Sequence, residues 1–179
     1  MPTQMMHLHL DSKAVATNDF ERRVRQKAMQ QKGNLAMAWK QWLADLAPWT
    51  HAITLTFKRR GLHQQVINEK IMSDAIKHFL LVLNRKCFKR SAIRKGMRIP
   101  VVAVIGWGAY KDHPHAHLCL VHPQHIDYPT FCEYINFSAD RTEWMNNERD
   151  IRPYRTTGWI AYLVDHGIEN IIGDLTTAH

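Results

Sequence analysis

Four segments of the chain have the pattern of β-strands, because apolar residues either alternate with polar ones or form short β-branched runs between turn signals. These segments are residues 51–58, 100–105, 115–121 and 150–154. In the first, Ile53, Leu55 and Phe57 alternate with threonines. The run at 100–105 is valine-rich and too short for a typical helix, so it predicts a buried strand.

Other segments have apolar residues at helical spacing. The predicted helices cover residues 18–32, 35–46, 69–88, 129–137 and 157–166. Gly33 and Asn34 are expected to interrupt the N-terminal helical region, and Pro48 to close it. We therefore predict a helical extension over 1–47, followed by an α+β domain over 48–179. That domain has a central antiparallel sheet flanked by helices.

Charge adds a class of partner to this picture. The 179 residues include 24 Lys and Arg against 16 Asp and Glu, a net charge of +8. Nucleic acid is the commonest polyanion that such a domain binds. Lys and Arg residues are concentrated in two places, directly after the first predicted strand and around the end of the 69–88 helix. Both groups are predicted to contact the phosphate backbone of a nucleic acid. The cations concerned are Lys58, Arg59, Arg60, Lys89, Arg90, Arg94 and Lys95.

Cysteine usage and the apolar runs suggest a compartment. The three cysteines form no CxxC pair, and their odd number does not favour a disulfide framework. The sequence has neither a secretory leader pattern nor an apolar run of membrane-spanning length. We expect a cytoplasmic protein that has no membrane partner.

The candidate chemistry starts at His115-Ala116-His117. On a strand, both imidazoles project from one face, while Ala116, Leu118 and Leu120 point to the core. Two neighbouring imidazoles can converge on one metal ion. The alternative is an ordinary half-buried strand with two polar residues facing outward.

Tyr162 and His166 are four residues apart and share one face of the last predicted helix. If that helix crosses the sheet near His115 and His117, three imidazoles and one phenol meet. A metal ion there would polarise a phosphate, and Tyr162 would attack the phosphorus. Alternatively, Tyr162 is an aromatic anchor for the helix.

Three segments together resemble the HUH endonuclease superfamily, whose domains are related to the RRM fold. Residues 53–57 resemble its first strand, His115-Ala116-His117 its metal motif, and residues 158–162 its nucleophile helix. Within the superfamily, the sequence is most similar to replication initiators (Rep proteins) of plasmids and filamentous phages. The resemblance covers about residues 50–170.

The resemblance implies a DNA nickase. It would use Mn²⁺ or Mg²⁺ to cleave single-stranded DNA, or a DNA hairpin, at an origin or element end. Tyr162 would form a 5′-phosphotyrosine link, and the same chemistry in reverse would rejoin strands. No helicase segment is present in the sequence, so a host helicase would do the unwinding. Trp107 is a candidate for base stacking or for packing.

The sequence departs from the family at the third metal ligand. Gly106 stands where many relatives have a glutamate, and Asp165 and His166 stand where a lysine is usual. We predict that His166 replaces the glutamate and that Asp165 supports the metal site or pairs with a basic residue. His113 and Asp112 are competing ligands.

These departures leave several interpretations open. Tyr110 is a reserve nucleophile beside the metal motif. A non-catalytic nucleic-acid-binding module would have the same charge and fold. A HUH transposase and a zinc-dependent hydrolase of another kind are the remaining alternatives.

Overall fold

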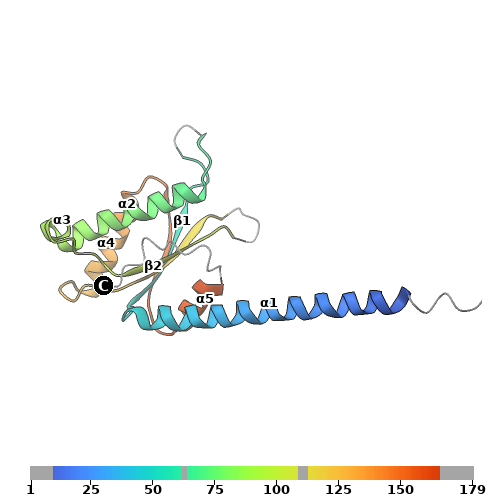
Figure 1. Cartoon of the computed structure of the whole chain (residues 1–179). Helices are drawn as coiled ribbons and strands as arrows, with labels where there is room; N and C mark the ends of the chain where they lie inside the picture. Colours follow the sequence, from blue (N-terminus) through green and yellow to red (C-terminus); the bar gives the residue numbers. More distant parts are fainter. Residues whose placement is uncertain (1–9, 62–63, 109–112, 166–179) are drawn as a thin grey trace, which may run out of the picture. The chain divides into compact units, whose positions relative to one another are not determined.

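The computed structural model describes residues 10–61, 64–108 and 113–165. The chain divides into two units, Met1–Trp39 and Lys40–His179. The first consists, where described, of most of helix α1 (Leu10–Leu46), and the second holds everything that follows. The second unit runs β1 (His51–Phe57), α2 (Glu69–Phe88), α3 (Arg90–Arg94), β2 (Val101–Gly106), β3 (His115–Leu120), α4 (Tyr128–Asp140), β4 (Met145–Pro153) and α5 (Gly158–Asp165) (Figure 1).

The four strands form one antiparallel sheet in the order β2-β3-β1-β4. A βαββαβ chain order with two non-sequential central strands is the split βαβ arrangement of ferredoxin-like domains. The predicted α+β fold with a central antiparallel sheet is confirmed. Strand β3 lies between β1 and β2, so the His-x-His segment occupies the middle of the sheet.

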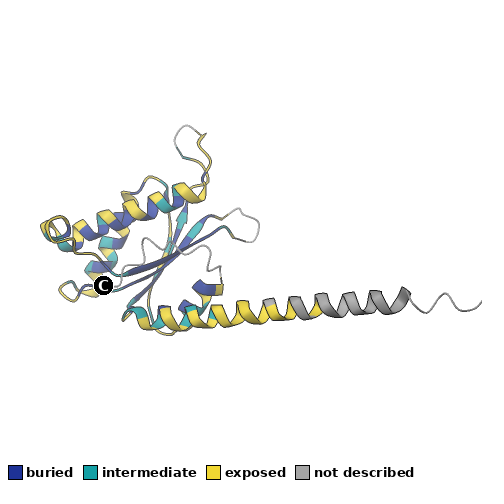
Figure 2. Ribbon diagram, in the orientation of Figure 1, coloured by how far each residue is buried: buried dark blue, intermediate teal, exposed yellow. Residues whose placement is uncertain are grey.

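Helices α2 and α4 cover one face of the sheet. Alternate strand residues point into this core, including Ile53, Leu55 and Leu118, and they meet Phe79 of α2 and Phe131 of α4. All five are almost completely buried, and Figure 2 shows the strands as the most buried part of the domain. The side-chain period of two along each strand therefore directs the predicted apolar set inward.

The opposite face of the sheet is covered by α5 and by residues of the second unit around the end of α1. Ile160, Leu163 and Leu43 are buried there. The indole of Trp49 donates to the Leu43 carbonyl oxygen at 2.7 Å, and the sheet below contributes the fully buried Cys119. This second layer brings the last helix over the face that carries His117.

Two predicted elements need correction, the helix break at Gly33 and the loop after α2. Helix α1 continues through Gly33 without a break: a Cβ at that position would meet no other atom within 4 Å, and a glycine inside a helix costs only about 1 kcal/mol relative to alanine. The two compact units meet between Trp39 and Lys40, so the buried Leu43 belongs to the second unit, whereas the predicted extension ends at residue 47. The predicted basic loop after α2 contains the short helix α3.

Strand β4 is longer than its predicted range, 150–154, because it starts at Met145. Its first half consists mostly of exposed polar residues, so the sequence there lacks the alternation of apolar and polar residues that predicts a strand. At the sheet edge, backbone pairing with β1 maintains the strand without an apolar set.

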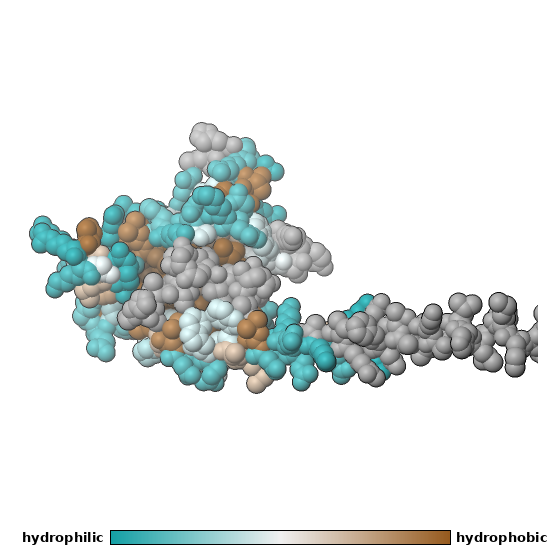
Figure 3. Space-filling view, in the orientation of Figure 1, coloured by the Kyte–Doolittle hydropathy of each residue, from teal (hydrophilic) through white to brown (hydrophobic). Residues whose placement is uncertain are grey.

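On the face shown in Figure 3, the described residues are mostly hydrophilic. Figure 3 shows hydrophilic side chains over much of the helical part of the domain, interrupted by apolar side chains around α3. Ile93 of α3 is 70% exposed. Within the part of the chain that the structure describes, no helix is long and apolar enough to cross a membrane.

Candidate active site

His115 and His117 lie side by side on the sheet face that α5 covers. Their ring centroids are 4.6 Å apart. His117 is almost completely buried in the middle of the sheet, opposite Thr54 of β1, and His115 lies at the end of the strand and is partly exposed. The pair thus runs from the interior to the edge of the domain.

Each of the two rings has a hydrogen-bonding partner at Nδ1. The Nδ1 atom of His115 is 2.7 Å from the His113 carbonyl oxygen, which can only accept, so this nitrogen carries the proton. The Nδ1 atom of His117 is 3.0 Å from Thr54 Oγ1. The partner of Nδ1 sets the tautomer of a metal-binding histidine, and for His115 it leaves a lone pair on Nε2.

Tyr162 extends from α5 to the buried histidine. Its hydroxyl oxygen is 3.2 Å from Nε2 of His117, and its ring is 4.9 Å from that imidazole, centroid to centroid. Tyr162 is 39% exposed, so solvent reaches the Tyr162–His117 contact from the tyrosine. Tyr162 and His117 are 45 positions apart in sequence, yet the phenol lies next to the His-x-His motif.

Trp159 holds α5 against the sheet. Its indole donates to the Leu118 carbonyl oxygen at 3.3 Å, and its ring stacks on Tyr162 and meets His117 edge-on. At the other end of the helix, the Asp165 carboxylate pairs with Lys40 at 2.8 Å. Asp165 thus pairs with a basic residue, one of the two placements considered for it.

Most of the candidates for a third metal ligand belong to segments that the structure does not describe. His166, Asp112 and the reserve nucleophile Tyr110 are all outside the described residues. His113 is described, and its main-chain oxygen, rather than its ring, supports His115. Within residues 10–61, 64–108 and 113–165, no three His, Cys, Asp or Glu side chains are grouped to hold a metal ion.

Gly106 is the register partner of His115 on the neighbouring strand. A Cβ at this position would lie 2.5 Å from Nε2 of His115. Two non-bonded atoms do not come this close, so one of them would have to move. The imidazole therefore occupies the space that a side chain at 106 would need. The glycine and the position of the His115 ring depend on each other, which explains physically why a glutamate at 106 does not fit this arrangement.

We expect Gly106→Ala to move the His115 ring with little loss of stability, because the contact is with the far end of that side chain rather than with backbone. If His115 is a metal ligand, moving its ring should weaken Mn²⁺ binding by about tenfold or more, which is the usual effect of mutating a residue that orients a metal ligand. Electron paramagnetic resonance titration with Mn²⁺ measures this affinity, and thermal unfolding measures stability. Unchanged Mn²⁺ affinity would show that His115 does not bind the ion.

The predicted DNA-binding cations divide into two groups. Lys58, Arg59 and Arg60 follow β1 at the end of the sheet where His115 lies, since Thr56 pairs with His115. The second group, on α3 and its flanks, is at the opposite end of the sheet. There the carbonyl oxygen of Cys87, near the end of α2, contacts His125, which follows β3. The residues of this second group are Lys89, Arg90, Arg94 and Lys95, all exposed.

Trp107 packs against the core that α2 and α4 cover, on the sheet face opposite the two histidines. It continues the inward-facing set of β2, which includes Ile105. This contact supports the packing alternative for Trp107, and base stacking by its partly exposed ring stays a prediction. Alternation along β2 could have indicated this, because Trp107 is an even number of residues from the apolar Val101.

Sequence reasoning missed the contribution of Thr54 and Trp159. Thr54 alternates with core residues on β1, so the sequence predicts it on the polar face of the strand. Its position opposite His117 follows only from the pairing of β1 with β3. Cys87 and Cys119 are buried, and burial raises the pKa of the Cys87 thiol to about 12. These two thiols are therefore unsuitable as nucleophiles at neutral pH.

No family model, curated protein or solved structure matches this chain.

Proposed function

We propose that this protein is a divalent-metal-dependent DNA nicking and strand-transfer enzyme of the HUH type, with Tyr162 as nucleophile. The observation that supports this most directly is the 3.2 Å approach of the Tyr162 hydroxyl to Nε2 of His117, beside His115. A phenol next to paired imidazoles combines a nucleophile with ligands for an ion that activates phosphate.

The donor set fits a metal ion as a two-histidine half-site. The Nδ1 proton of His115 is directed to a carbonyl oxygen, so its Nε2 is a neutral ligand, and His117 has a hydroxyl partner on Nδ1. Imidazole nitrogens suit Mn²⁺ better than Mg²⁺. When bound, the ion supplies Lewis-acid polarisation of the scissile phosphate. His166 is the proposed third ligand.

In the cleavage step, the phenolate oxygen of Tyr162 forms a bond to phosphorus, and the bond from phosphorus to the 3′ oxygen breaks. The phenol proton leaves to a base, and the departing 3′ oxygen gains a proton from solvent. The products are a 5′-phosphotyrosine and a free 3′-hydroxyl. Attack by another 3′-hydroxyl reverses the step, so no nucleotide cofactor is needed.

The substrate is single-stranded DNA or a hairpin at the origin of a plasmid or phage, or at the end of a mobile element. Lys58, Arg59 and Arg60 extend the positive charge from the His115 end of the sheet and would contact the backbone near the scissile phosphate. A helicase partner would supply single strands. The buried thiols of Cys87 and Cys119 suit the reducing cytoplasm.

The test is to incubate the full chain with a pool of end-labelled and circular single-stranded DNA and Mn²⁺, followed by denaturing electrophoresis. We expect labelled DNA to migrate with the protein, and chelation to abolish this band. Mass spectrometry of the adduct should place the nucleotide on Tyr162.

Two outcomes would contradict the proposal. DNA binding without an adduct, on both linear pools and hairpins, would favour a non-catalytic binding module. This alternative is consistent with Gly106, which provides no carboxylate ligand at the end of β2. Metal-dependent turnover without any covalent product would favour a hydrolase.

A further inference from the structure

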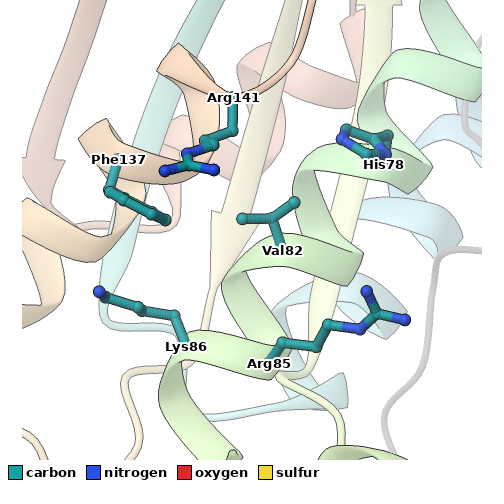
Figure 4. A pocket seen from close by; sticks show the side chains of 6 residues that line it. All are labelled: His78, Val82, Arg85, Lys86, Phe137 and Arg141. Carbon is teal, nitrogen blue, oxygen red and sulfur yellow. The ribbon is translucent and has the colours of Figure 1, made fainter.

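The outer surface of α2 and α4, away from the sheet, has a groove rich in cationic groups. It is lined by His78, Val82, Arg85 and Lys86 of α2 together with Phe137 and Arg141 at the end of α4, and its volume is about 490 Å³. Figure 4 shows the side chains of the two helices facing each other across this space.

Two of the three cations of this groove, Lys86 and Arg141, lie over one aromatic ring. The Lys86 ammonium lies 4.3 Å from the Phe137 ring centroid, and the Arg141 guanidinium lies 4.8 Å from it. Such contacts order long side chains before a ligand arrives, which reduces the entropy lost on binding.

Carboxylates of the described residues leave these charges without an ion pair. Among the described residues, no carboxylate pairs with Arg85, Lys86 or Arg141. Asp140, the immediate neighbour of Arg141, pairs with Arg149 instead. Three positive side chains around one cavity thus present an uncompensated field to an anion.

The ligand that fits best is a nucleic-acid backbone. Guanidinium groups bind phosphate oxygens with two parallel hydrogen bonds, and the apolar Val82 and Phe137 lie between the cations. Alternating charged and apolar contacts match the phosphates and sugars of a strand. An acidic protein segment would match the charge but not this alternation.

The groove and Tyr162 belong to opposite faces of the sheet, because α2 and α4 cover one face and α5 the other. We propose that the groove between α2 and α4 binds the phosphodiester backbone of a DNA segment distinct from the one at Tyr162. This inference rests on the proposed function in one respect, the choice of DNA as the polyanion that the groove binds.

The experiment compares two double variants, each of which lowers the net charge of +8 by two. Arg85→Gln/Arg141→Gln changes the groove, and Lys27→Gln/Lys32→Gln removes two exposed cations from α1 as the matched control. Both are made in the Tyr162→Phe background, so DNA cleavage does not enter. The probe is fluorescein-labelled oligothymidylate of about 20 nucleotides, titrated by anisotropy at about 50 to 300 mM salt.

For the groove variant, we expect the slope of log affinity against log salt to fall in magnitude by about 1.4, since each single-strand phosphate contact contributes about 0.7. The control should lose less than about half as much. Arg85→Lys/Arg141→Lys, which keeps the charges, should recover most of the slope.

Equal slopes for the groove and control variants would overturn the proposal. Groove-dependent binding of polyglutamate without any groove-dependent binding of DNA would also overturn it, in favour of an acidic protein partner. Failure of the covalent adduct assay affects only the proposed nickase function, because the groove is tested by affinity alone.

Discussion

Replacing Tyr162 with phenylalanine should abolish the covalent protein–DNA adduct while DNA affinity stays within about twofold of the wild type. The change removes one oxygen atom, the one 3.2 Å from Nε2 of His117, and keeps the ring that stacks on Trp159. Loss of a covalent nucleophile typically lowers a rate by roughly 10⁴-fold or more, so no adduct should be detectable.

The measurement is the yield of labelled protein on a denaturing gel over time, with Mn²⁺ in excess. Tyr128→Phe is a matched control, because this tyrosine is 40% exposed, close to the 39% of Tyr162, and stacks on His51 at the other end of the sheet. Its adduct yield should equal that of the wild type.

An adduct that persists in Tyr162→Phe would remove this residue as nucleophile. Tyr110→Phe then becomes the informative variant, since Tyr110 is in the segment that precedes the metal motif. Adduct loss in Tyr110→Phe alone would leave the HUH-type reaction in place but assign it to another side chain.

A second large effect should appear in the pH dependence of stability, through His51. This residue begins β1 and is completely buried between aromatic rings: it stacks on Tyr128 and meets Phe131 edge-on. Its Nε2 atom and that of His122 are both buried without a hydrogen-bonding partner among the described residues. Burial, together with the nearby His122, lowers the pKa of His51 to about 4.

The direction of the effect follows from this lowered pKa. In the unfolded chain the imidazole takes up a proton below its ordinary pKa of 6.5, whereas in the folded protein it stays neutral down to about 4. The His51 contribution to stability is therefore complete above about pH 6.5 and is lost as the pH falls toward 4. Between about pH 7 and pH 5 the folded state should lose roughly 2 kcal/mol from this residue.

His51→Phe should reduce the pH dependence by that amount, because phenylalanine keeps an aromatic ring in the site and cannot be protonated. Urea unfolding of the full chain at the two pH values gives the free energies. His78→Gln, which removes an exposed imidazole from α2, is the control. If His51→Phe keeps the full wild-type pH dependence, another group is responsible for the acid lability.

Local pattern predicted most elements of the second unit. The bounds of α2 agree with the structure, and β1 and β3 differ by one residue at most, because alternation and helical spacing are properties of short segments. The pattern was misleading where a local preference is weak. Gly33 is accommodated inside α1, and the polar start of β4 is held by pairing at the sheet edge.

The sequence by itself determined that His115 and His117 share a face, since side chains on a strand alternate with a period of two. It also determined the inward set of Ala116, Leu118 and Leu120, and the excess of positive charge. These features depend on composition and on neighbours a few residues away.

Only the tertiary structure decided which side chains meet across the chain. Strand order places Thr54 and Gly106 on either side of β3, and packing of α5 brings Tyr162 to His117 across 45 positions of sequence. Such contacts depend on strand register and on the direction in which a helix crosses a sheet, and both result from burial of the whole apolar surface rather than from any local motif.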